Sequence, residues 1–81
     1  MLDRLSAAQN RIVGAKQVSK QLSLDTVEVL YLADDAEPRV LQGVRQACDG
    51  RAVRIIQVPT MQELGQLCGI EVGAACAALL K

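Results

Sequence analysis

Residues 27–38 read VEVLYLADDAEP, and this stretch shows the sharpest change of pattern in the sequence. The run from Val27 to Ala33 is β-branched, aliphatic or aromatic apart from one glutamate, which is typical of a strand buried on both faces. Glu37-Pro38 then predicts the start of a helix, because proline suits the first helical position. A buried strand joined to a helix by a short polar turn indicates an α/β domain built in layers.

Short apolar runs alternate with segments of helical period on either side of this stretch. The predicted elements are a helix over residues 2–10, a brief strand over 11–13, a helix over 15–22, a helix over 38–48, a second buried strand over 52–58 and a helix beginning at 61. Thr60 and Glu63 form a capping box at the start of the last of these helices. The alanine-rich tail over residues 74–80 fits a helix or a third buried strand equally well.

The composition fits a single domain over residues 1–81. Of the 81 residues, 51% are apolar, which is enough for one modest core. Tyr31 is the only aromatic residue, so we expect aliphatic packing with Tyr31 inside the core. The sequence has no apolar run long enough to span a bilayer and no recognisable signal peptide, so we expect a cytoplasmic protein that does not contact membranes.

Neither catalysis nor metal binding is expected from the residue types present. The sequence has no histidine, so it lacks the commonest general base and the usual partner of a serine or cysteine nucleophile. It also lacks the glycine-rich loops that bind nucleotide phosphates. The widely spaced Cys48, Cys68 and Cys76 are expected to be buried thiols. We therefore expect no catalytic residue, no metal and no cofactor.

The charged residues are separated along the chain, although the net charge is zero. Four basic residues and no acid lie between residues 4 and 24, whereas five acids and no base lie between residues 25 and 37. A fold that separates these segments would have one positive face and one negative face. The acids of residues 34–37 are explained by the helix that follows them, because a helix dipole favours negative charge at its N-terminus.

The first segment with a pattern suited to binding begins at Gly14. This glycine directly precedes a predicted helix that contains Lys16, Gln17 and Lys20. The free N–H groups of a helix start can bind phosphate or base edges, and the lysines would add positive charge. Lysines four residues apart are also common on an ordinary solvated helix face, so the pattern alone leaves both interpretations open.

The second such segment covers residues 64–75. It places Ile70 and Val72 in a turn flanked by glycines, where exposed apolar side chains would indicate a partner surface. The alternative is that both side chains fold back into the core, and the pattern does not decide between the two.

Together these segments resemble the kink-turn RNA-binding ribosomal-protein family of the archaeal large-subunit L-seven-Ae type, and especially its short bacterial paralogues. The match runs over essentially the whole chain. Its most specific parts are residues 14–17 with Lys20, residues 35–38 and residues 64–75. The resemblance implies a three-layer α/β/α sandwich around a four-stranded mixed sheet, and it makes the alanine-rich tail a strand.

The resemblance also implies roles in RNA binding for individual residues. In this family, the glycine-led helix start meets the tandem sheared G·A pairs of a kink-turn. The residues here that match it are Gly14, Lys16, Gln17 and Lys20. The residues that match the segment packing over the bulged nucleotides are Ile70, Glu71 and Val72. Glu37 matches a position that holds a flipped-out base in some members.

Two functional hypotheses follow. The first is a non-catalytic, monomeric protein that recognises a kink-turn in ribosomal RNA or in an mRNA leader, as a ribosomal-protein-like or ribosome-associated factor. The alternative is a protein-interaction module of the same fold that has lost RNA binding. Zero net charge favours the alternative, as does Met61, which stands where some members of the family have a lysine that contacts RNA.

Overall fold

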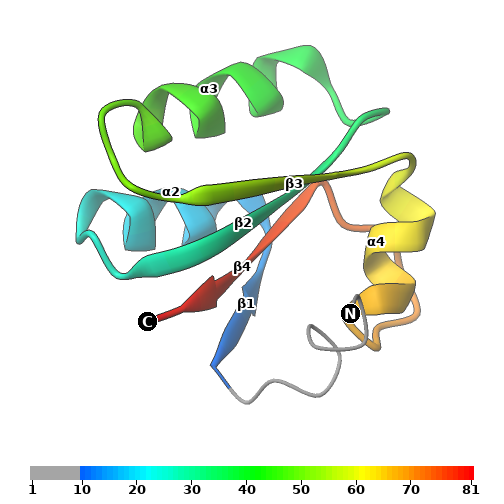
Figure 1. Cartoon of the computed structure of the whole chain (residues 1–81). Coiled ribbons are helices and arrows are strands. Elements are labelled where there is room, and N and C mark those ends of the chain that lie inside the picture. Colours follow the sequence, from blue (N-terminus) through cyan, green and yellow to red (C-terminus); the bar gives the residue numbers. More distant parts are fainter. Residues whose placement is uncertain (1–9) are drawn as a thin grey trace.

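A computed structural model describes residues 10–81 of the chain (Figure 1). The elements in chain order are β1 (Arg11–Val13), α2 (Ala15–Ser23), β2 (Val27–Ala33), α3 (Pro38–Cys48), β3 (Arg54–Val58), α4 (Met61–Leu67) and β4 (Cys76–Leu80). The predicted helix over residues 2–10 lies outside the described residues, apart from Asn10. The other predicted elements are present, and the bounds of β2 agree with the prediction at both ends.

The strands form one four-stranded mixed sheet in the order β1-β4-β2-β3. β2 pairs with β3 in parallel, whereas β4 runs antiparallel to both β1 and β2. The alanine-rich tail is therefore a strand, as the resemblance implied, and it lies between two partners. Small side chains suit this place, because both faces of β4 are covered and four of its five residues are buried.

Helices cover the two faces of the sheet, which makes three layers (Figure 1). On one face, Leu30 and Leu32 pack with α2 and α3. On the other face, Tyr31 packs with α4 and is only 2% exposed. Burying one such leucine fully contributes about 1.5–3 kcal/mol, so this alternation of neighbours along β2 holds the layers together. The predicted α/β/α sandwich and the buried tyrosine are confirmed.

The second predicted buried strand differs from the prediction. It begins at Arg54 and not at residue 52, and Val58 is its only buried residue. The physical reason is its place in the sheet, because β3 is an edge strand that pairs with β2 alone. Its outer side therefore faces solvent, and Ile55 is 40% exposed.

Three helices begin at the same end of the sheet. Val13, Ala33 and Val58 end β1, β2 and β3, and each strand is followed by a helix. The strand pairing places all three residues at the end of the sheet where β4 starts. Val13 pairs with Ala77 of β4, and Ala33 pairs with Val58 and follows Leu32, which pairs with Cys76 of β4. We call this end of the sheet the helix-start edge.

Candidate nucleic-acid interface

The start of α2 is held at the helix-start edge by Gly14. Its backbone has φ 102° and ψ 144°, a conformation that residues with a Cβ rarely adopt. Its N–H donates to the carbonyl of Cys76 at 2.9 Å, and its carbonyl accepts from the N–H of Val18 at 3.0 Å. Glycine therefore allows the chain to turn from β1 into α2 while it stays bonded to β4.

Among the residues that the structure describes, none compensates the first turn of α2 as a hydrogen-bond acceptor. The N–H groups of Ala15, Lys16 and Gln17 precede the first helical hydrogen bond, and Gly14 has no side chain to accept from them. No acidic residue lies in this turn either. The positive end of the helix dipole is thus open, which suits an anion or the acceptor atoms of a base.

Side chains around this helix start add charge and hydrogen-bonding groups. Lys16, Gln17 and Lys20 are exposed, whereas Val18 and Leu22 on the other face of α2 are fully buried. Within residues 10–81, neither lysine forms an ion pair. Both ammonium groups are therefore available to a ligand, that of Lys16 in the first turn of α2 and that of Lys20 in its last turn.

The loop between α4 and β4 contains the second predicted segment. Val72 is 70% exposed and Glu71 is exposed as well. Ile70 is half-buried and packs against the core cluster on the α4 face of the sheet. Each of the two earlier interpretations is correct for one residue, since Val72 faces solvent while Ile70 turns back toward the core.

This loop is fixed to α4 by its backbone. The N–H of Ile70 donates to the carbonyl of Gly65 at 3.1 Å, and the N–H of Ala74 donates to the carbonyl of Met61 at 3.0 Å. Between these bonds the carbonyl of Val72 lies so close to Gly65 that an added Cβ would be 2.0 Å from its oxygen. The sequence prediction did not assign Gly65 a role, although an isolated glycine within a helical pattern is a signal of close backbone approach.

Glu37 lies at the start of α3, next to the same edge. It is exposed at the N-cap position and makes no side-chain capping bond. The turn before it is bonded to its neighbours by the N–H of Ala33, which donates to the carbonyl of Ala75 at 3.0 Å. The β2–α3 turn thus lies beside the end of the loop that contains Val72.

One acid of this turn differs from the prediction that these acids lie at the start of the following helix. Glu37 does so, as the N-cap residue of α3. Asp35 Oδ1 instead accepts from the N–H of Met61 at 2.7 Å, so this carboxylate compensates the start of α4. The reason is tertiary, because β3 lies next to β2 in the sheet and delivers the start of α4 to the end of β2.

The structure therefore brings the predicted segments to one edge. Gly14 bonds to Cys76, and Ala33 bonds to Ala75, so the start of α2, the end of the loop and the β2–α3 turn are backbone neighbours. Lys20 lies farther along α2, in its last turn.

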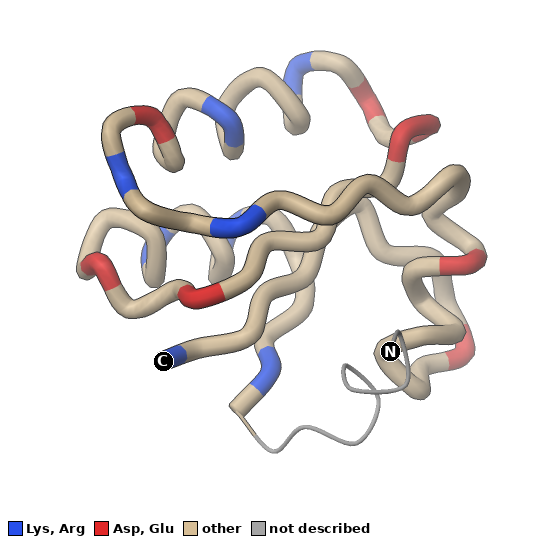
Figure 2. The backbone as a smooth tube through the Cα atoms, viewed as in Figure 1, with Lys and Arg blue, Asp and Glu red and all other residues tan. Residues whose placement is uncertain are grey.

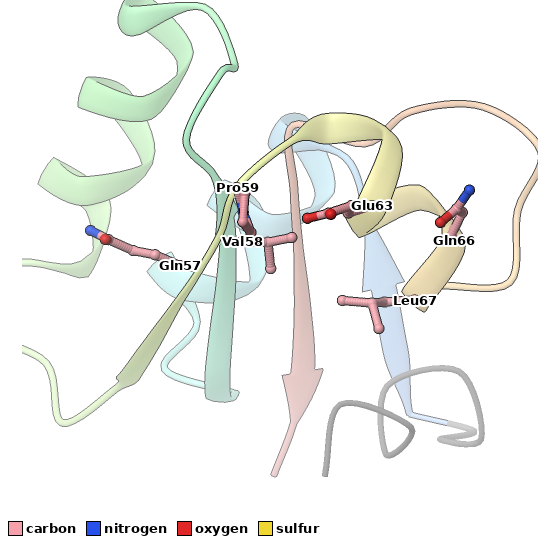
Figure 3. A pocket seen from close by; sticks show the side chains of 6 residues that line it. All are labelled: Gln57, Val58, Pro59, Glu63, Gln66 and Leu67. Carbon is pink, nitrogen blue, oxygen red and sulfur yellow. The ribbon is translucent and has the colours of Figure 1, made fainter.

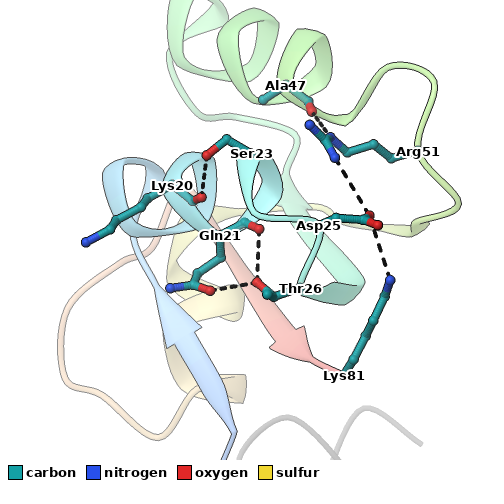
Figure 4. A network of polar contacts seen from close by, with 8 residues as sticks. All are labelled: Lys20, Gln21, Ser23, Asp25, Thr26, Ala47, Arg51 and Lys81. Atoms are coloured by element: carbon teal, nitrogen blue, oxygen red, sulfur yellow. Dashed lines mark hydrogen bonds and ion pairs between the residues drawn. The ribbon is translucent and has the colours of Figure 1, made fainter.

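The predicted acidic face is not formed. β2 separates the acids of residues 25–37, which lie at both of its ends (Figure 2). Asp25 lies at the end away from the helix-start edge and forms ion pairs of 3.7 Å with Arg51 and with Lys81 (Figure 4). Acidic and basic groups are therefore mixed at both ends of the sheet.

A hollow of about 340 Å³ lies between the end of β3 and α4 (Figure 3). It is lined by Gln57, Val58, Pro59, Glu63, Gln66 and Leu67. None of these residues belongs to the predicted RNA-binding set, and the hollow opens beside α4 and not beside α2.

The cysteines are buried, as expected. Burial raises the pKa of Cys76 to about 11. Burial also raises the pKa of Cys68, and the positive charge of Arg11 opposes that increase. A buried thiol with a raised pKa is a poor nucleophile, because the thiolate is the reactive form. Among residues 10–81 no cluster of potential ligands has the composition of a metal site.

Comparison with known proteins decides the family. Residues 1–81 match the Ribosomal protein L7Ae/L30e/S12e/Gadd45 family. The chain belongs to this family. A relative in Caldanaerobacter subterraneus subsp. tengcongensis, named an RNA-binding protein, is 46% identical over 68 residues, which are 84% of this chain and 83% of the relative. The large ribosomal subunit protein eL8 of Haloquadratum walsbyi is 29% identical over 83% of this chain and 57% of that protein.

A solved structure supports the same family fold. The Giardia lamblia 15.5kD RNA binding protein superposes with a TM-score of 0.87, at 23% identity, over 99% of this chain and 68% of that one. Within the described residues, no helix has both the length and the apolar character needed to cross a bilayer.

Proposed function

We propose that this protein binds structured RNA containing a kink-turn, with its tandem sheared G·A pairs, and catalyses no reaction. One observation carries the proposal. The uncapped start of α2, with exposed Lys16 and Gln17, is hydrogen-bonded through Gly14 to Cys76, the first residue of β4, directly after the loop that contains Val72. Membership of the family and the names of the relatives support RNA as the ligand class.

Each predicted residue has a chemistry that suits this ligand. The amide of Gln17 both donates and accepts, so it can pair with the edge of a purine. Lys16 and Lys20 supply charge to phosphates that crowd together at a kink. The exposed side chain of Val72 suits packing against nucleotides bulged out of the stack, with Glu71 beside it, and the half-buried Ile70 supports this part of the loop from the core.

Glu37 completes the proposed surface from the β2–α3 turn. Its exposed carboxylate can accept hydrogen bonds from the N–H groups of a flipped-out base. Binding would select the kinked shape from an ensemble of RNA conformations, since only that shape meets both α2 and the loop. A monomer in the cytoplasm, acting on ribosomal RNA or on an mRNA leader, is the setting we propose.

The test is a titration of the protein into a labelled RNA hairpin that contains a kink-turn. A control hairpin has the tandem G·A pairs changed to Watson–Crick pairs, and both are measured at two salt concentrations because phosphate contacts give a salt dependence. Tight binding to the kink-turn hairpin alone supports the proposal. Equal weak binding to both hairpins, or none, refutes it.

Variants then locate the surface. Lys20→Ala and Gln17→Ala are expected to weaken binding by roughly tenfold each without changing the melting temperature, because both side chains are exposed. Lys81→Ala is the matched control, since it removes the same charge at the end of the sheet away from the helix-start edge. Equal losses in Lys20→Ala and Lys81→Ala would show general attraction between charges and no specific surface.

A protein-interaction module of the same fold is the second candidate. It is favoured by the 70% exposure of Val72, together with a net charge of zero. A pull-down that recovers the same protein before and after nuclease treatment, and loses it with Val72→Asp, would support this candidate. Recovery that depends on intact RNA would count against it.

A further inference from the structure

The carboxylate of Asp35 links two elements that contribute to the proposed RNA surface. Asp35 lies in the turn after β2, and its Oδ1 accepts from the N–H of Met61 at 2.7 Å. Met61 is the first residue of α4, so its N–H has no acceptor within its own helix. The bond therefore fixes the start of α4 to the turn that also contains Glu37.

Met61 also contacts the loop between α4 and β4 through its backbone carbonyl and its Cβ. The carbonyl of Met61 accepts from the N–H of Ala74 at 3.0 Å, and the Cβ of Met61 lies within 3.3 Å of the place a Cβ on Gly73 would occupy. At the other end of α4, Gly65 supports Ile70 and Val72. The loop thus moves with α4, and α4 is tied to the end of β2 by Asp35.

We propose that Asp35 is a positioning residue for RNA binding, which sets the place of residues 70–72 relative to the start of α2 without contacting the RNA. The inference rests on the proposed function. A positioning role would explain why Asp35 lies at the proposed RNA surface, where a carboxylate is otherwise unfavourable because it repels phosphate.

The neighbouring Asp34 provides a matched control. Both aspartates are exposed and have the same charge, but among the contacts within residues 10–81 only Asp35 accepts a hydrogen bond through its side chain. If the two acids act only through charge, removing either one strengthens RNA binding slightly. If Asp35 positions the loop, the two substitutions have effects of opposite sign.

The experiment compares RNA affinity for Asp34→Ala, Asp35→Ala and Asp35→Asn on the kink-turn hairpin at one salt concentration. Asp34→Ala is expected to bind up to about twofold more tightly, because one screened repulsion is removed. Asp35→Ala is expected to bind about tenfold more weakly, the scale of one charge-assisted hydrogen bond. Asp35→Asn keeps an acceptor oxygen and is expected to bind at least as well as wild type.

Equal effects of Asp34→Ala and Asp35→Ala, or equal losses in Asp35→Ala and Asp35→Asn, would overturn the proposal. Melting curves establish that each variant is folded. Should Asp35→Ala not fold, Asp35→Glu replaces it, because this variant keeps the charge and moves the acceptor by one methylene. Weaker binding by Asp35→Glu is then expected, and binding equal to wild type overturns the proposal.

A measurement without RNA separates this inference from the proposed function. Amide hydrogen exchange of Met61, Ala74 and Ile70 is followed by NMR in the free protein. Asp35→Ala is expected to speed exchange at all three amides, while Asp34→Ala leaves it unchanged, because the loop opens together with the start of α4. If wild type fails to bind the hairpin, the proposed function falls, and this exchange pattern still decides whether Asp35 holds the loop; unchanged exchange rejects it.

Discussion

The starts of α2 and α4 lie at the same edge of the sheet, yet they are completed in opposite ways. At α4, Thr60 Oγ1 accepts from the N–H of Glu63 at 3.1 Å, Asp35 accepts from Met61, and Glu63 places a carboxylate in the first turn. At α2, the cap is Gly14, and no side chain or acid from residues 10–81 compensates the first turn. The protein satisfies one helix start internally and leaves the other open.

The difference separates a structural helix start from one available to a ligand. The acceptors at the start of α4 belong to the protein itself, whereas every missing acceptor at α2 leaves an N–H donor for a ligand. Substitutions at α4 are therefore expected to change the free energy of unfolding more than a substitution at the start of α2.

Gly65→Ala is expected to have the largest effect. The new Cβ would lie 2.0 Å from the carbonyl oxygen of Val72, so either the loop or α4 must move. Overpacking of this kind costs about 1–3 kcal/mol, and urea unfolding measures it directly. RNA affinity should also fall, because the loop is displaced.

Gly43→Ala is the matched control for that change. Gly43 is also helical, and an added Cβ there meets nothing within 4 Å. Alanine is favoured over glycine in a helix by about 1 kcal/mol, so this variant should be more stable than wild type. If both variants lost the same stability, the close approach of Val72 to Gly65 would not be the cause.

Thr60→Ala is expected to have a medium effect. Loss of an N-cap side chain costs typically about 1 kcal/mol, because the N–H of Glu63 loses its acceptor. Thermal melting measures the loss, and Thr60→Ser, which keeps the hydroxyl, should restore most of it. A full loss in Thr60→Ser would show that the threonine methyl group, and not the cap, stabilises this turn.

Much of this contrast was predictable from local patterns. The glycine before α2, the Thr60 cap of α4 and the buried run of β2 are signals within a few residues, and the structure contains each of them. Of the predicted capping box, the bond from the N–H of Glu63 to Thr60 is present. What depends on distant partners was not predictable. The bond from Met61 to Asp35 spans 26 residues, and the edge position of β3 follows from strand order, which periodicity does not encode.

Residues 74–80 and the loop over residues 70–72 also depend on contacts that local sequence patterns do not reveal. Periodicity left residues 74–80 open between helix and strand, because alanine is compatible with both; pairing with β1 and β2 decides the matter. For residues 70–72, a glycine-flanked turn indicates a loop but not the direction of its side chains. Ile70 and Val72 have opposite surroundings because Gly65 lets the loop backbone lie directly on α4.

Lys16→Glu places a carboxylate in the first turn of α2, where α4 already has Glu63. An acid in the first turn stabilises a helix by about 0.3–1 kcal/mol, so this variant should unfold at slightly higher urea concentration than wild type. Its RNA affinity should nevertheless fall by tenfold or more, on the order of 1.4 kcal/mol, because the substitution turns attraction for phosphate into repulsion. Gln62 occupies the same position in α4, so Gln62→Glu should give the gain in stability without the loss of affinity. If Lys16→Glu gains stability and loses RNA affinity while Gln62→Glu only gains stability, then α2 gives up helix stability to remain open to the ligand. If stability and affinity change in the same way in both variants, the two helix starts are equivalent.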